Sequence, residues 1–378
     1  MSSTSADLAT ITIPADLLPA DGRFGSGPSK VRPEPVAKLA AVAGDLLGTS
    51  HRKPAVRDQV KRVRDGLRQL FSLPDDYEVA LGNGGATLFW DAAVFCLIQR
   101  RSAHAVFGEF SSKFAASSRL ADFLEDPVEV TSPFGSHPTL EPIDGVDLYA
   151  LTHNETSTGV AMPIRRPAAD AFVAVDATSG AGALPVRAQD FDAYYFSPQK
   201  AFGSEGGLWW ALLSPAAVER IERLSASSRY IPPMLDLGIA LDNSRSEQSY
   251  NTPSVSTIFL MAEQIDWLLE RGGLDASVAQ CRAKSSHLYD WAGARAWASP
   301  YVSDPAMRSD VVCTIDIDER VSADAITGVL RRHGVLDIDA YRKLGRNQLR
   351  VAVFPAVELD DVQRLTAAID HVVEALSA

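Results

Sequence analysis

The sequence has few cysteines and no long apolar run. Three of its 378 residues are cysteine, Cys96, Cys281 and Cys313, and their spacing fits neither a disulfide framework nor a set of metal ligands. No stretch reaches the ~20 consecutive apolar residues that cross a bilayer. Residues 1–20 lack the basic and apolar segments of a secretory signal. We therefore expect a cytoplasmic protein with reduced thiols, no bound metal and no membrane partner.

Positive charge is also scarce. Lys and Arg number 36 against 48 Asp and Glu, which gives a formal net charge of -12. Nucleic acids and anionic membrane surfaces favour proteins rich in Lys and Arg, so neither is an expected partner. A small anionic ligand is not excluded, because it responds to a local cluster of arginines.

The usual nucleotide-binding loops are missing as well. The Gly-rich turn at residues 82–87 contains neither a Walker lysine nor a G-x-G-x-x-G pattern. It follows a strand expected at residues 78–81 and precedes a helix expected at residues 86–98. Free N–H groups at such a helix N-terminus bind phosphate. A tight turn that needs glycine only for its backbone angles is the alternative interpretation.

Two chemically distinctive residues follow neighbouring predicted strands. Asp176 ends a strand at residues 172–175, and Lys200 follows a strand at residues 193–196 after the run Ser197–Gln199. A lone lysine of this kind is usually solvated, and a lone aspartate usually caps a turn. Together they supply an acid for a pyridine nitrogen and an amine for an aldehyde carbon, which is what pyridoxal phosphate requires.

The order of elements predicts an α/β fold with two domains, because 378 residues exceed the usual size of one core. Strands that alternate with helical connections are typical of a mainly parallel sheet whose ligands bind at the carboxyl ends of the strands. We predict an N-terminal arm at residues 1–20, a large domain at residues 21–271 and a small α+β domain at residues 272–378. A helix expected at residues 56–70 places these basic side chains on a solvated face: Arg57, Lys61, Arg62, Arg64 and Arg68.

Arginines gather in two other regions. His51 and Arg52 lie in one, and residues 341–350 form the other. Guanidinium groups bind carboxylate and phosphate in a bidentate manner, which suits a substrate with two or three negative charges. Arg350 lies in an otherwise apolar strand, so we expect it to have a buried anionic partner.

As a set, these motifs resemble those of the phosphoserine aminotransferases, class V members of the fold type I pyridoxal-phosphate enzymes. The resemblance runs from about residue 22 to the C-terminus, and residues 21–30 and 344–350 are similar to the actinobacterial branch. The motifs that carry it are Ser50-His51-Arg52, Gly84-Gly85-Ala86, Asn154-Glu155-Thr156, Asp176, Ser197-Pro198-Gln199-Lys200, Tyr250-Asn251-Thr252-Pro253 and Arg350.

This resemblance implies a large domain with a mainly parallel seven-stranded sheet, a smaller C-terminal α+β domain, and a role for each matching residue. Lys200 would bind the cofactor aldehyde and move the proton between the substrate Cα and the cofactor C4′, while Asp176 would pair with the pyridinium nitrogen. Phe110 would lie on the ring face and Thr156 would bond the ring hydroxyl. The cofactor phosphate would be held by Gly85, Ala86, Thr87 and Gln199, with Asn251 and Thr252 from a second subunit, which implies a homodimer with shared sites.

The resemblance also implies a reaction: L-glutamate and 3-phosphohydroxypyruvate give 2-oxoglutarate and O-phospho-L-serine, a step of L-serine biosynthesis. Arg350 would bind the α-carboxylate, and His51 and Arg52 would bind the distal phosphate or the glutamate side chain. Many relatives have an arginine where this chain has Thr87, so we expect Arg342 and Arg346 to replace it. A second substrate, from pyridoxine biosynthesis, is left open.

Three other functions are alternatives. A cysteine desulfurase needs a nucleophilic cysteine in a mobile loop, and none of the three cysteines lies in one. An alanine:glyoxylate aminotransferase has little use for extra arginines at the distal end of its substrate. A cofactor-free binding protein of the same fold would not need both Lys200 and Asp176.

Overall fold

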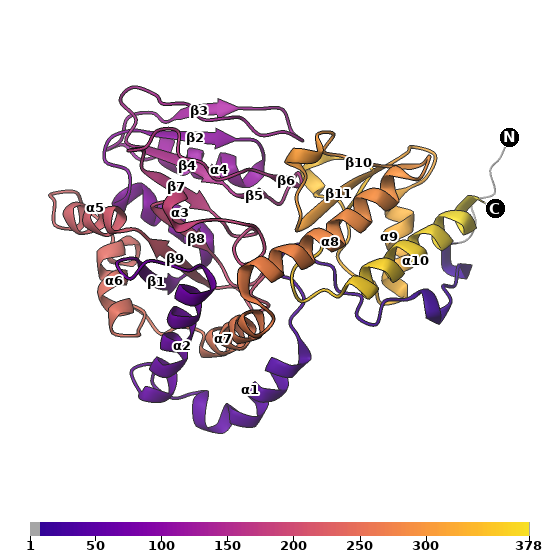
Figure 1. Ribbon diagram of the computed structural model, residues 1–378, viewed down its shortest axis with the longest axis horizontal. Helices are drawn as coiled ribbons and strands as arrows, with labels where there is room; N and C mark the ends of the chain where they lie inside the picture. The colour runs from indigo at the N-terminus through magenta and orange to yellow at the C-terminus, as the bar shows by residue number, and fades with distance from the viewer. Residues whose placement is uncertain (1–7, 378) are drawn as a thin grey trace.

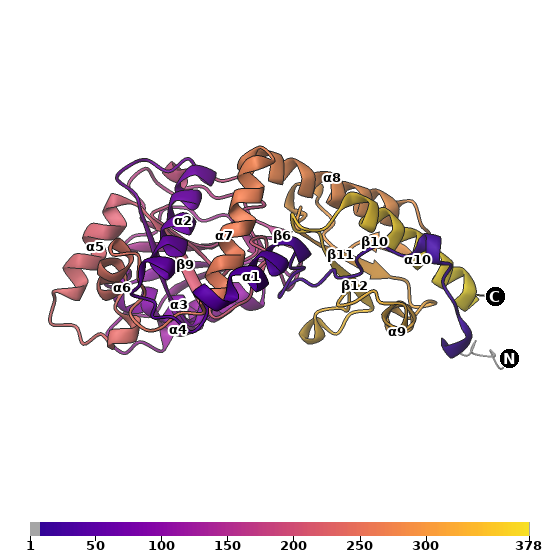
Figure 2. The ribbon, with the colours of Figure 1, turned by 90° about the horizontal axis from the view of Figure 1, so that it is seen from below.

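The computed structural model describes residues 8–377, which form two lobes side by side along the long axis of the molecule (Figures 1 and 2). The larger lobe is built around a seven-stranded sheet. In spatial order its strands are β1 (Glu78–Asn83), β9 (Leu208–Leu213), β8 (Ala193–Phe196), β7 (Val173–Asp176), β4 (Leu148–Thr152), β2 (Ser102–Val106) and β3 (Val128–Thr131). All run in one direction except β9, which is antiparallel to both neighbours. The predicted mainly parallel sheet is confirmed.

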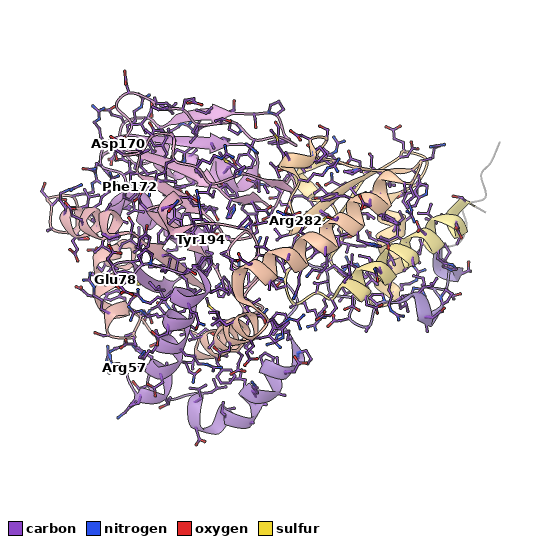
Figure 3. All side chains as sticks on the ribbon, in the orientation of Figure 1. Arg57, Glu78, Asp170, Phe172, Tyr194 and Arg282 are labelled. Atoms are coloured by element: carbon purple, nitrogen blue, oxygen red, sulfur yellow. The ribbon has the colours of Figure 1, made fainter. Side chains whose placement is uncertain are left out.

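Helices cover both faces of this sheet. One face packs on α2 (Pro54–Leu70) and α7 (Val255–Glu270). The other face packs on α3 (Gly85–Cys96), α4 (Glu109–Arg119), α5 (Pro215–Ser225) and α6 (Leu237–Arg245). Successive side chains of a strand point to opposite faces, so Tyr194 joins the first of these cores and Tyr195 the second. Figure 3 shows Tyr194 deep within the larger lobe.

The smaller lobe contains a three-stranded antiparallel sheet. Its strands are β10 (Ala298–Pro300), β11 (Val312–Ile317) and β12 (Gln348–Ala352), and its helices are α8 (Gly273–Gly293), α9 (Ala323–Arg332) and α10 (Leu359–Ser377). The long helix α8 begins at the predicted domain boundary, where Gly272 adopts the left-handed conformation, with φ of 105°. It runs along the smaller lobe, where Figure 3 labels Arg282. This lobe has its own apolar core.

The N-terminal segment packs into the smaller lobe. Ile11, Ile13 and Phe24 are part of its core. The backbone N–H of Phe24 donates to Leu336, and the carbonyl of Phe24 accepts from Ala352. The chain then crosses to the larger lobe and forms α1 (Pro33–Leu46), which lies at its edge (Figure 1). Residues 1–7 of the predicted arm lie outside the described residues, and the domain limits stay a prediction.

Several details differ from the sequence-based expectations. Arg64 is buried, donates to the carbonyl of Val79 and pairs with Glu247, so the prediction of a solvated face was wrong for this residue. The predictions omitted α5, α6 and β10. Short elements complete the fold: η1 (Leu8–Thr10), η2 (Ala15–Leu17), β5 (Asn154–Glu155), β6 (Val160–Ala161), η3 (Ala188–Asp190), η4 (Pro233–Leu235), η5 (Pro305–Met307) and η6 (Arg342–Leu344).

The cysteines are buried and free, as the sequence analysis expects for incidental thiols. Within residues 8–377, no helix combines the length and the apolar character that crossing a bilayer requires.

Candidate active site

A cavity of about 410 Å³ opens at the carboxyl ends of β4, β7 and β8. Ligands of open α/β sheets bind at this edge. Within the described chain, the cavity is lined by every residue predicted to bind a cofactor except Asn251 and Thr252. These lining residues are Gly85, Ala86, Thr87, Phe110, Thr156, Asp176, Gln199 and Lys200. The fold therefore brings together residues that are up to 115 positions apart in the sequence.

Lys200 is held in this cavity by contacts along its whole length. Ser29 fixes its backbone, because the Ser29 hydroxyl donates to the Lys200 carbonyl over 2.5 Å. Its Nζ donates to Oγ1 of Thr156 over 3.1 Å and lies 5.7 Å from the centre of the Phe110 ring. Gly27 packs so closely that a Cβ there would lie 2.8 Å from Cε of the lysine. Burial lowers the pKa of Lys200 to about 8, so a larger share of this amine is neutral and nucleophilic near neutral pH.

Asp176 ends β7 and is almost completely buried, with 5% of its surface exposed. Its Oδ2 accepts a hydrogen bond from the indole Nε1 of Trp90 over 3.0 Å, and its Oδ1 accepts one from the backbone N–H of Thr178 over 2.9 Å. Burial raises its pKa. The carboxylate is thus fixed at the wall of the cavity that also contains Lys200.

The Gly-rich turn leads into α3, as the sequence predicts. Gly84 and Gly85 adopt positive φ angles of 101° and 72°, which residues with a side chain rarely adopt. No side chain caps the N-terminus of α3, so its first N–H groups are free to bind an anion. Oε1 of Gln199 lies buried at the same cavity without a hydrogen-bond partner. Glycines at positive φ fit a tight turn, and the uncapped helix start beside them also fits an anion site.

The motif at residues 154–156 makes hydrogen bonds to several segments that surround the cavity. The hydroxyl of Thr156 donates to Ser179, and the carbonyl of Thr156 accepts from Nη1 of Arg350 over 3.3 Å. Glu155 points the other way and accepts from the backbone N–H groups of Phe110 and Ser111 at the start of α4. These hydrogen bonds attach the start of α4, which carries the Phe110 ring that lines the cavity, to Glu155.

A second cavity, of about 910 Å³, adjoins the first at Gly27 and Pro28. It is lined by Arg342, Arg346 and Arg350 among others. Among residues 8–377 no carboxylate pairs with Arg350, and its Nε is buried without a partner, so the described chain does not supply the anionic partner that was predicted for it. An arginine in an apolar strand indicates an anionic partner, but the sequence pattern does not show whether that partner is a protein carboxylate or a bound ligand.

The other arginines differ in what they contact. Arg346 forms an ion pair with Asp316 and stacks on Tyr301. Arg342 is exposed and has no ion pair within the described chain. Between them in sequence, Lys343 forms an ion pair with Glu109, the residue before Phe110, and this pair joins the two lobes.

Four predicted residues lie away from both cavities of this chain. His51 and Arg52 lie in the turn before α2, and Nε2 of His51 is buried without a partner. Asn251 and Thr252 are exposed, and the Thr252 carbonyl accepts from the side chain of Asn83. One chain alone does not bring them to Lys200.

Sequence reasoning missed Trp90, Ser179 and Gly27. Trp90 follows Ala86 by four positions, so the helical period alone places the two on one face of α3, and this signal was available. Ser179 and Gly27 carry no comparable signal, because their contacts join segments distant in sequence. Among residues 8–377, no three His, Cys, Asp or Glu side chains gather as metal ligands would.

The comparisons with known proteins agree with this geometry. Residues 37–337 match the family model described as aminotransferase class-V. The chain therefore belongs to the class-V aminotransferases and is a transaminase.

Its nearer relatives narrow this assignment. Phosphoserine aminotransferases from Rhodococcus opacus and from a Nocardioides species are each 55% identical to the chain, over 97% of its length and 99% of theirs. The solved phosphoserine aminotransferase of Cytophaga hutchinsonii has a TM-score of 0.86 at 25% identity and covers 93% of this chain and 99% of its own. A PLP-bound phosphoserine aminotransferase from Trichomonas vaginalis shares the fold, with a TM-score of 0.79 at 18% identity, over 93% of this chain and 99% of its own. Within the class, the chain groups with the phosphoserine aminotransferases, and the predicted fold type I architecture is confirmed.

Proposed function

We propose that the chain is a pyridoxal-phosphate-dependent transaminase that transfers the amino group of L-glutamate to 3-phosphohydroxypyruvate, giving 2-oxoglutarate and O-phospho-L-serine. The observation that carries this proposal is the joint burial of Lys200 and Asp176 in one cavity, next to Arg350, whose Nε has no hydrogen-bond partner. The names of the relatives at 55% identity support the choice of substrate.

The residues of the cavity fit this cofactor. The uncapped start of α3, with Gly85, Ala86 and Thr87, suits the cofactor phosphate, and the side-chain N–H of Gln199, which lines the same cavity, could donate to it as well. Phe110 would lie on the ring face, and Thr156 would bond the ring hydroxyl. Asp176, as a buried carboxylate, suits the protonated ring nitrogen. Pyridoxal phosphate, when bound, supplies an electron sink that stabilises negative charge at the α-carbon of an amino acid.

Lys200 has two tasks in this proposal. Its amine would hold the cofactor through the aldehyde, and as a free amine it would take up the α-proton of the substrate. The lowered pKa of Lys200, about 8, suits both tasks, because a general base works best when its pKa lies near the working pH. Thr156 keeps Nζ oriented toward the cavity through the 3.1 Å hydrogen bond.

The arginines would hold the negative charges of the substrate. Arg350, with its buried unpaired Nε, is suited to the α-carboxylate. For the distal phosphate, Arg342 is better supported than Arg346, because the charge of Arg346 is already matched by Asp316. His51 and Arg52 would complete the site from a second subunit.

We further propose a homodimer with shared active sites. α1 exposes apolar side chains, Val36 and Val42 among them, and Leu47 follows at its end. Asn251 and Thr252 are likewise exposed. Burial of these residues against a second copy would explain an apolar surface that water does not favour, and would deliver Asn251, Thr252, His51 and Arg52 to the partner's cavity.

A half reaction tests the proposed function. The purified protein is loaded with pyridoxal phosphate, and O-phospho-L-serine, L-serine, L-cysteine and L-alanine are added separately while the visible absorption of the bound cofactor is followed. We expect rapid bleaching by O-phospho-L-serine, with 3-phosphohydroxypyruvate released, and much slower bleaching by L-serine. Bleaching led by L-cysteine would favour a desulfurase, and bleaching led by L-alanine an alanine:glyoxylate aminotransferase. A protein that takes up no cofactor would favour a binding protein.

The second substrate can be tested in the same assay. After conversion to the aminated form, the protein is mixed with 3-hydroxy-2-oxo-4-phosphooxybutanoate, the precursor in pyridoxine biosynthesis. Return of the visible band at a rate comparable to that with 3-phosphohydroxypyruvate would assign both substrates to this site.

A further inference from the structure

Trp90 contacts the carboxylate of Asp176 but belongs to none of the motifs considered above. It lies on the second turn of α3, is 4% exposed and lines the smaller cavity. Its indole Nε1 donates to Oδ2 of Asp176 over 3.0 Å. The other carboxylate oxygen is held by the backbone N–H of Thr178. Each oxygen of this buried carboxylate therefore has one fixed donor.

The contact follows from the topology of the larger lobe. Val173 and Val175 point into the core on the α2 and α7 face, whereas Ala174 points into the core on the α3 face. Alternation along β7 therefore directs Asp176 toward α3. Trp90 belongs to the same core, so its ring is packed in place and its N–H points at the strand end. The donor is held by packing, which is what positions a catalytic group precisely enough to act.

We propose, on the basis of the function proposed above, that Trp90 is a positioning residue whose indole N–H orients the Asp176 carboxylate and keeps it ionised for the cofactor ring nitrogen. A carboxylate in an apolar wall resists ionisation, and a hydrogen bond to its charged form counteracts that resistance. Burial raises the pKa of Asp176, and the hydrogen bonds from Thr178 and Trp90 oppose this shift. A bond from a neutral donor to a charged acceptor is also stronger than a neutral pair.

Another tryptophan of the same lobe provides a matched control. Trp210, on β9, is fully buried and its Nε1 has no hydrogen-bond partner. It packs in the core on the opposite face of the sheet from Trp90. Trp210→Phe therefore removes a second buried indole from the same lobe, one with no hydrogen bond to Asp176.

The experiment compares Trp90→Phe and Trp210→Phe with the unchanged protein. The dissociation constant of pyridoxal phosphate is measured with each apo-protein, and the visible band of each loaded protein is titrated with pH. For Trp90→Phe we expect cofactor binding weakened about tenfold, since the lost bond involves a charged group, and a displaced spectral titration. For Trp210→Phe we expect neither change. Trp90→His, which restores a ring N–H, should recover part of the affinity. A folded Trp90→Phe variant with unchanged affinity and titration would overturn the proposal.

A second measurement covers the case in which Trp90→Phe does not fold. The indole N–H resonances of the six tryptophans are recorded by ¹⁵N NMR in the apo-protein and in its Asp176→Asn variant. One indole resonance should move strongly, because its acceptor loses its charge, and absence of any such change would overturn the contact. This comparison needs no cofactor, so it tests Trp90 even if the proposed function fails in the half reaction.

Discussion

The cavity in the larger lobe and the arginine segment of the smaller lobe, residues 341–350, differ in how many of their polar groups find partners within the chain. In the cavity, Lys200 and Asp176 are buried and held by hydrogen bonds from fixed neighbours. In the arginine segment, Arg342 has no ion pair within residues 8–377, and Nε of Arg350 has no partner. The larger lobe therefore holds its catalytic side chains in place without a ligand, whereas the arginine segment has guanidinium groups that remain available to bind an anion.

The largest expected effect comes from the cavity. Lys200→Ala should slow the half reaction with O-phospho-L-serine by at least ~10³-fold, because the general base is removed. The matched control is Lys284→Met: Lys284 is also buried, but it donates to the carbonyls of Phe354 and Val357 in the smaller lobe. That control should lower the midpoint of thermal unfolding and keep the visible band of the bound cofactor. Comparable loss of activity in both variants would show that burial of a lysine, and not its place in the cavity, matters.

The second largest effect is expected at Arg350, which lies between the cavity and the rest of the arginine segment. Arg350→Lys keeps the charge but loses the planar fork, so KM for O-phospho-L-serine should rise roughly 10-fold to 100-fold. The spectrum of the bound cofactor should change little, because Arg350 contacts the cavity only through the Thr156 carbonyl. An unchanged KM would remove Arg350 from the carboxylate site.

A smaller effect separates the two exposed arginines. Arg342→Ala should raise KM for O-phospho-L-serine about tenfold, since a charge-assisted bond to phosphate is lost, and should leave KM for L-glutamate nearly unchanged. Arg346→Ala should change KM less, because Asp316 already neutralises that guanidinium. If Arg346→Ala had the larger effect, the ion pair seen here would have to open when substrate binds.

The smallest effect concerns pH. Because the neutral amine attacks the aldehyde, a lowered pKa moves the reactive range of Lys200 downward, from its ordinary value of 10.5 to about 8. The rate of cofactor uptake by the apo-protein, corrected with a free alkylamine as reference, should rise about tenfold per pH unit below pH 8 and level off above it. A rise that continues to pH 10 would indicate a solvated lysine.

The sequence was sufficient to predict the site residues that lie at the carboxyl ends of strands. Asp176 and Lys200 each follow a short apolar strand, and parallel strands deliver their carboxyl ends to one edge. Contacts between distant segments were not predictable. Ser29 on Lys200, Trp90 on Asp176 and the pairing of Arg346 with Asp316 depend on packing that has no local pattern.

The same limit explains the errors. A basic residue on an amphipathic helix is usually expected to be solvated, yet Arg64 is buried, where it donates to the carbonyl of Val79 and pairs with Glu247. Arg350 in an apolar strand predicted a buried anionic partner, yet within residues 8–377 it donates to a carbonyl and pairs with no carboxylate. In both cases the sequence identified an unusual position, and only the packed structure identified the partner.

The central claim is that one buried lysine carries the cofactor. The protein loaded with pyridoxal phosphate is reduced with borohydride, digested, and the modified peptide is identified by mass spectrometry. We predict one pyridoxyl group per chain, on Lys200, and none when O-phospho-L-serine has first converted the cofactor to its aminated form. Modification of another lysine, or of none, would contradict it.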